Sequence, residues 1–223
     1  MPRHLQREIE NIKKKLLTMG AVAEERVSQA TRSVVERDAE LAQQIMKGDY
    51  EIDQMEVDIE EECLKILALH QPVAIDLRFI IAVLKINSDL ERVGDLAVNI
   101  AERSAYLATS NETICMPFDF QGMATKVQQM LSASIDALVN LDTKQAHRVR
   151  AMDDKVDAMN RQMYELVKNR MPDNPEEVNC MLHSLSIGRH LERIADHATN
   201  IAEDVVYLVE AQIVRHTPES FDS

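Results

Sequence analysis

Residues 91–108 read ERVGDLAVNIAERSAYLA and residues 192–209 read ERIADHATNIAEDVVYLV, so one motif occurs twice in the chain. The two copies are 101 residues apart and are identical at 10 of 18 positions, against about one identity expected from average amino-acid usage. In both copies apolar residues recur at the three- and four-residue spacing of an amphipathic helix. We therefore predict an internal duplication in which each copy contains this long helix.

A second register extends the duplication towards the N-terminus of each copy. At an offset of 104 residues the matched pairs are Met19 with Met123, Ser28 with Ser132, Asp38 with Asp142, Asp49 with Asp153 and Asp53 with Asp157. The offset changes by three residues between the second and third helix of each copy, where a loop absorbs the difference. The predicted architecture is two tandem three-helix bundles.

Composition agrees with an all-α fold of six long helices. The 223 residues include only 5 Gly, 6 Pro and no Trp, whereas strong helix formers such as Ala, Leu, Glu, Met and Lys are abundant. Breakers and caps place the helices at about residues 2–36, 38–70, 73–108, 119–140, 142–171 and 175–215. We expect a first unit over residues 1–110, a connector over 111–118, a second unit over 119–215 and a disordered tail over 216–223.

Charge and cysteine content limit the setting. The net charge is −13, which disfavours nucleic acid and favours cations or basic protein surfaces as partners. Cys63, Cys115 and Cys180 are widely spaced and lack a CxxC pattern, so we expect buried or idle thiols in a reducing cytosol. The N-terminus has no apolar segment typical of a signal peptide, and no apolar run is long enough to span a membrane. A cytoplasmic location follows as an expectation.

Each unit carries two pairs of acids at four-residue spacing. The second helices contain DxxxD and the third helices ExxxD, which gives Asp49, Asp53, Glu91 and Asp95 in the first unit and Asp153, Asp157, Glu192 and Asp196 in the second. Residues four apart lie one turn above each other on a helix, so each motif presents two carboxylates to one side. Oxygen ligands of this kind suit Mg²⁺, Mn²⁺ or iron. The eight acids are the candidate metal ligands.

A solvated acidic face is the alternative interpretation. With 38 acids in the chain, roughly six pairs at this spacing arise by accident. A helical wheel also places Glu91 and Asp95 opposite apolar residues such as Val93 and Ile100, and therefore away from the core. Repulsion between acids one turn apart disfavours such pairs, however, and both stripes recur at matched positions. His197 replaces Leu96 on the apolar side, and we expect it to be packed rather than to bind a metal.

The segments PVAIDLRFIIAVLKINSDLERVGDLAVNIAE (residues 72–102) and HLERIADHATNIAED (residues 190–204) resemble the PhoU family. The resemblance covers residues 1–215 and implies two similar three-helix bundles side by side. It also implies a cytoplasmic, non-enzymatic regulator that represses the phosphate-starvation response when phosphate is plentiful. The implied partners are the ATPase subunit of the phosphate ABC transporter and the phosphate sensor histidine kinase, with a homodimer as the expected assembly.

The same resemblance implies metal binding at the acid motifs. Some family members hold multinuclear iron or zinc on their outer surface through E(D)xxxD motifs, and other divalent cations are compatible with such ligands. Glu102 and Glu203 are second-tier candidates. Glu56 of the first unit matches Asn160 of the second, so the two sites are expected to differ in affinity.

Two other functional classes remain open from the residues. One is a helical scaffold or dimerisation module that binds no metal. The other is a di-iron carboxylate enzyme, which needs inward-facing Glu-x-x-His pairs on two helices. Gly94 and Ala195 stand at the third position after Glu91 and Glu192, so the motifs lack that histidine.

Overall fold

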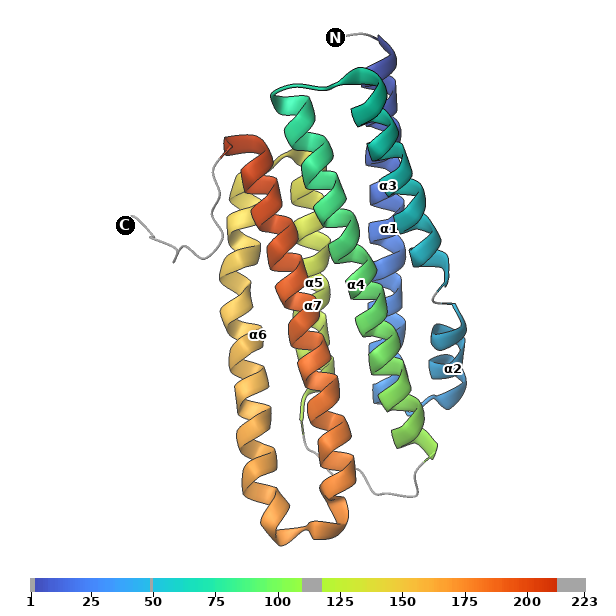
Figure 1. The fold of residues 1–223 in the computed structure, drawn as a ribbon. Helices are drawn as coiled ribbons and strands as arrows, with labels where there is room; N and C mark the ends of the chain where they lie inside the picture. The colour runs from blue at the N-terminus through green and yellow to red at the C-terminus, as the bar shows by residue number, and fades with distance from the viewer. Residues whose placement is uncertain (1–2, 49, 110–117, 212–223) are drawn as a thin grey trace, which may run out of the picture.

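The computed structural model describes residues 3–48, 50–109 and 118–211, and this part of the chain is a bundle of long helices without strands (Figure 1). The first repeat contains α1 (Arg3–Glu36), α2 (Ala39–Lys47), α3 (Tyr50–His70) and α4 (Ile75–Thr109). The second contains α5 (Phe120–Asn140), α6 (Thr143–Arg170) and α7 (Val178–Glu210), with two 3₁₀ turns, Met171–Asp173 and Pro175–Glu177, before α7. The predicted all-α fold of two tandem helical bundles is confirmed.

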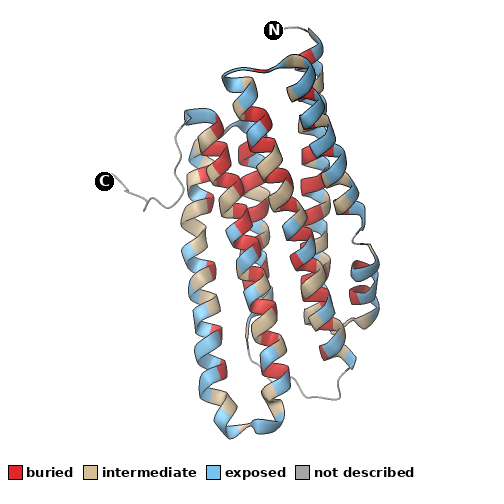
Figure 2. Cartoon of the chain, in the orientation of Figure 1, coloured by how far each residue is buried: buried red, intermediate tan, exposed pale blue. Residues whose placement is uncertain are grey.

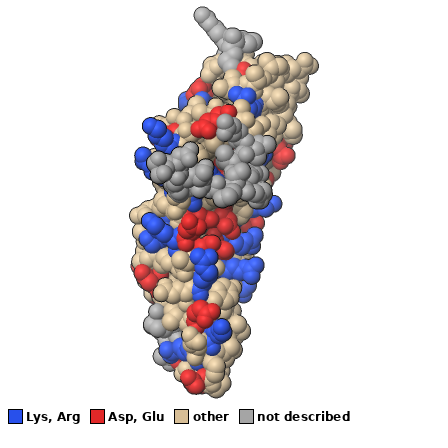
Figure 3. Space-filling model, turned by 90° about the vertical axis from the view of Figure 1, so that its left-hand side faces the viewer, with Lys and Arg blue, Asp and Glu red and all other residues tan. Residues whose placement is uncertain are grey.

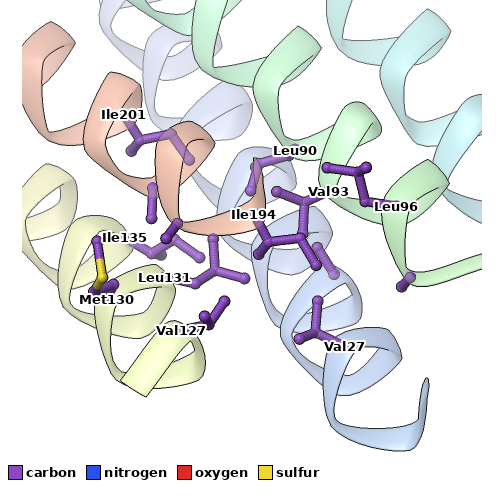
Figure 4. Packing of buried hydrophobic residues seen from close by; sticks show 14 of the residues in the cluster. Val27, Leu90, Val93, Leu96, Val127, Met130, Leu131, Ile135, Ile194 and Ile201 are labelled. Carbon is purple, nitrogen blue, oxygen red and sulfur yellow. The ribbon is translucent and has the colours of Figure 1, made fainter. Parts of the chain in front are cut away.

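The two repeats share one hydrophobic core. α4 packs on α7 and α1 packs on α5, so that these four helices form the centre, with α3 and α6 on the outside. Buried residues line the inward faces of all the long helices (Figure 2). Figure 4 shows side chains of both repeats meeting in this centre, among them Val27, Leu90, Val93, Leu131, Ile135 and Ile194. Because each such side chain contributes about 1.5–3 kcal/mol when buried, the central interface fixes how the repeats dock.

The duplicated N-cap signals are confirmed. Asp38 precedes α2, and its side chain accepts a hydrogen bond from the backbone N–H of Leu41 at 2.9 Å. Asp142 precedes α6 and accepts from the N–H of Gln145 at 3.1 Å. A carboxylate at this position satisfies one of the backbone donors that the first turn leaves free. The matched aspartates therefore cap the start of α2 in the first repeat and of α6 in the second.

The predicted second helix, residues 38–70, was wrong in one respect: it is divided into α2 and α3. α2 ends at Lys47 and is capped by Gly48, whose N–H donates to the carbonyl of Ile45 at 3.0 Å. Arg26 of α1 then occupies the interruption, because its Nη2 donates to the Gly48 carbonyl at 2.9 Å and lies 3.0 Å from Glu51. A Cβ at position 48 would collide with this guanidinium. A residue of another helix therefore binds at the break.

The ends of the predicted sixth helix also differ. Pro172 and Pro175 lack an N–H, and the chain forms 3₁₀ turns there, so that α7 begins at Val178. It ends at Glu210, where Ala211 adopts the left-handed conformation with φ 59°. The connector over 111–118 and the tail over 216–223 lie outside the described residues except for Phe118.

The cysteine prediction was wrong for Cys180, which is disulfide-bonded rather than an idle thiol. Cys63 is a buried free thiol, as expected, and Cys115 lies outside the described residues. No helix within the described ranges has the length and apolar character needed to cross a membrane.

Candidate metal centre

Three carboxylates of the first repeat converge between α3 and α4. Asp53, Glu91 and Asp95 each place an oxygen within 4.8 Å of the others. The neighbouring residues explain this approach: Gly94 packs against Ile52, and a Cβ at Gly94 would lie 2.8 Å from Ile52 Cδ1. Because glycine lets the two helices come close at this level, the acids that follow Ile52 and Gly94 in sequence are brought together.

The charges in this first cluster are poorly compensated. Burial, followed by the charges of Asp95, Glu56 and Asp53, raises the pKa of Glu91. Burial and then Asp53 likewise raise the pKa of Asp95. Carboxylates that hinder one another's ionisation are stabilised by a bound cation. The cluster therefore has the donor type and spacing that a metal ion requires.

The second repeat gathers its four acids between α6 and α7. Burial, followed by the charges of Asp196 and Asp157, raises the pKa of Asp153 to about 7. Asp153 Oδ1 is buried and has no hydrogen-bond partner, although a buried polar atom normally has one. Figure 3, which views the molecule from the side of α6, shows acidic side chains in one patch with Lys and Arg around it. A cation would supply the partner that this oxygen lacks.

The two clusters are not equivalent. No three ligand atoms of the second cluster, all of whose acids lie in the described part of the chain, come within 4.8 Å of one another. Asp157 lies 3.5 Å from Arg161, which competes for its charge. Glu56 adds a negative charge beside Glu91, whereas Asn160 stands at the matching position of the second repeat with its Oδ1 unpaired. The first cluster is therefore the more compact.

Seven of the eight predicted ligands thus lie in two clusters on the outer faces of the repeats, and Asp49 lies outside the described residues. Of the second-tier candidates, Glu203 lies 3.5 Å from Arg150 instead, and Glu102 is exposed. Sequence reasoning missed Asp154, which also raises the pKa of Asp153. Its position directly after Asp153 is the signal that was available. Asp95 and Asp196 are exposed, whereas Glu91 and Glu192 are half-buried, so the acid stripes lie at the helix edges and not in the core.

Comparison with known proteins assigns the fold to one family. The protein-family model described as "PhoU domain" matches residues 16–104 and again residues 120–205. A phosphate-specific transport system accessory protein PhoU homolog of Pseudomonas aeruginosa is 38% identical over 209 residues, which cover 94% of this chain and 86% of that protein. A homolog of Aquifex aeolicus is 39% identical over 211 residues, covering 94% and 95%.

Solved structures give the same result. The crystal structure of PhoU from Pseudomonas aeruginosa matches with a TM-score of 0.88 and 37% identity, and covers 93% of this chain and 99% of that one. The phosphate transport system regulatory protein PhoU from Streptococcus pneumoniae matches with a TM-score of 0.84 and 28% identity, covering 94% and 99%.

Proposed function

We propose that this chain, which belongs to the PhoU family, is a non-enzymatic cytoplasmic regulator of phosphate uptake. The observation that carries the proposal is the match of both repeats to the family model, with coverage of 94% of this chain and 86% to 95% of relatives named as accessory proteins of the phosphate-specific transport system. Since the similarity extends over nearly the whole of each protein, the relatives' role is a basis for assigning one to this chain.

The regulator would act by contact with the transport and signalling machinery. We propose the ATPase subunit of the phosphate transporter and the phosphate sensor histidine kinase as partners, and repression of the starvation response when phosphate is plentiful. The net charge of −13 supports docking on basic protein surfaces.

A homodimer is the assembly that the exposed face of α3 supports. Tyr50, Val57 and Leu64 follow one another at seven-residue spacing and are 72%, 45% and 53% exposed. Residues at this spacing lie along one side of a helix. Exposed apolar side chains in such a row favour pairing with a second copy of the chain.

Metal binding is part of the proposal. Asp49, Asp53, Glu91 and Asp95 would hold iron or zinc in unit 1–110, and Asp153, Asp157, Glu192 and Asp196 would do so in unit 119–215. The convergence of Asp53, Glu91 and Asp95 supports the first site, and the unpaired Asp153 oxygen supports the second. A bound cation neutralises the carboxylates and links two neighbouring helices. The metal-free scaffold is the competing interpretation.

Deletion of the gene in its host tests the regulatory role. We expect a reporter of phosphate-starvation genes to be expressed in phosphate-rich medium after deletion and to be silent again when the gene is restored. Both strains should express the reporter in phosphate-poor medium, which is the control for the reporter itself. An unchanged reporter in rich medium would count against the proposed function.

A further inference from the structure

The interface between α4 and α7 consists of two equivalent halves. Its antiparallel register is given by three pairs of contacting residues: Lys85 with Asp204, Asp89 with Asn200, and Tyr106 with His183. Every step along α4 is matched by an equal step back along α7. α4 and α7 are also the matching helices of the two repeats, related by the sequence offset of 101 residues. The interface therefore has an approximate two-fold relation centred on Gly94 and Ala195.

In one half of this interface, two acids are compensated by two basic residues. Asp204 has a side chain that is only 2% exposed, and its Oδ1 lies 3.1 Å from Lys85 Nζ. Asp89 Oδ1 lies 2.8 Å from His197 Nδ1. Buried carboxylates need such partners because water no longer solvates them. Each of the two carboxylates in this half therefore has a basic partner.

The other half carries basic residues where the first half carries acids. At the repeat offset Arg103 replaces Asp204, and His190 replaces Asp89. Their counterparts across the interface are Ser186, in the position of Lys85, and Leu96, in the position of His197. An acid that could neutralise the guanidinium is therefore absent from these four positions.

Two buried polar atoms of this half lack a hydrogen-bond partner. The register places Arg103 opposite Ser186, and Ser186 Oγ lies 3.3 Å from His190 Nε2. Arg103 Nε and His190 Nδ1 are both buried and have no hydrogen-bond partner. Arg189 and Arg193, on the same helix as His190, are close enough for their charges to act on it. This half of the interface therefore gathers several donors and positive charge without an acceptor to match them.

We propose that Arg103, His190 and Ser186 form a binding site for a small tetrahedral oxyanion of the phosphate type, placed between the two repeats. The guanidinium donates planar, charge-assisted hydrogen bonds to oxyanions, and an imidazole N–H and a hydroxyl can complete the set. The anion would supply the negative charge that Asp204 and Asp89 supply in the other half. Binding is a property of the purified chain and does not rest on the proposed regulatory role.

Calorimetric titration of inorganic phosphate into the metal-free protein, at constant ionic strength, tests the site. We expect saturable binding to the wild type and a loss of roughly tenfold or more in affinity for Arg103→Ala, because a charge-assisted hydrogen bond is removed. Arg103→Lys keeps the positive charge but loses the planar pair of guanidinium donors, so an intermediate affinity is expected. Arg148→Ala on the exposed face of α6 changes the net charge equally and should bind as the wild type does.

Ser186→Asp provides a test that removes no cationic group. An acid opposite Arg103 would recreate the internal pairing of the other half, and phosphate binding should be lost while the helical content is kept. Sulfate should compete with phosphate, because the site recognises a tetrahedral oxyanion. Absence of saturable binding, or equal affinities for the wild type, Arg103→Ala and Ser186→Asp, would overturn the proposal.

Discussion

His197 Nδ1 of α7 lies 2.8 Å from Asp89 Oδ1 of α4, and this pair joins the two repeats at a buried position. His197 is 7% exposed, as expected for a packed histidine. The first repeat has Leu96 at the matching position, so the pair occurs in only one half of the interface. It gives the docking of the repeats a polar contact that purely apolar packing would lack.

Asp89→Ala should lower the free energy of unfolding by about 1–3 kcal/mol, because a buried hydrogen-bonding group is left unpaired. The variant His197→Leu introduces the residue found at the matching position of the first repeat, and it removes the partner of Asp89 instead. We expect the double variant to be less destabilised than the sum of the two single changes. Urea unfolding followed by circular dichroism measures all three. Additive effects would show that the two side chains do not interact.

Replacement of Glu91 and Asp95 by Ala should lower the bound iron or zinc by about half, because the second repeat keeps its own oxygen ligands. Replacement of Glu192 and Asp196 as well should nearly abolish binding. Equilibrium dialysis with elemental analysis gives the metal content. Exposed Glu25 and Glu40 lie away from both motifs, and their double Ala variant is the control. Full metal content in the quadruple variant would contradict the assignment.

The same quadruple variant should respond differently to metal in a melting experiment. Without metal it should melt no lower than the wild type, since repulsion between acids one turn apart is removed. With excess metal the wild type should melt higher, because a ligand that binds only the folded state stabilises it by mass action. An identical metal response in both proteins would identify the carboxylates as a solvated face.

The raised pKa of Asp153 predicts a pH dependence in the metal-free protein. Between its ordinary value of 3.8 and about 7, the folded protein holds a proton on Asp153 that the unfolded chain has released. The free energy of unfolding should therefore fall as the pH rises through this range. Asp153→Asn should flatten the fall, and Asp173→Asn, at an exposed position outside the cluster, is the matched control. Unfolding curves measured at several pH values give the slope of the free energy of unfolding against pH. An equal slope in the wild type and in Asp153→Asn would contradict the raised pKa of Asp153.

The duplication made most of the fold predictable, because the same helix-cap residues and residue spacings occur in both repeats. Asp38 and Asp142 cap the matching segments of the two repeats, and the matched acids lie near one another in both repeats, although only Asp53, Glu91 and Asp95 converge closely. The break at Gly48 was missed although a glycine after Lys47 is a local helix-end signal, whereas the contact of Arg26 with Gly48 joins residues of two helices. The α4·α7 register was equally inaccessible, since it is set by contacts between residues more than 70 positions apart, such as Tyr106 and His183. Local periodicity carries no information about such pairings.

Copurification with the ATPase subunit of the phosphate transporter tests the central claim most directly. The chain would be captured through an affinity tag from cells grown in phosphate-rich medium and from starved cells, with an unrelated tagged helical protein as the control. We predict specific recovery of the ATPase subunit in rich medium and a clear change in recovery on starvation. Recovery no greater than with the control protein under both conditions would contradict a regulatory role exerted at the transporter.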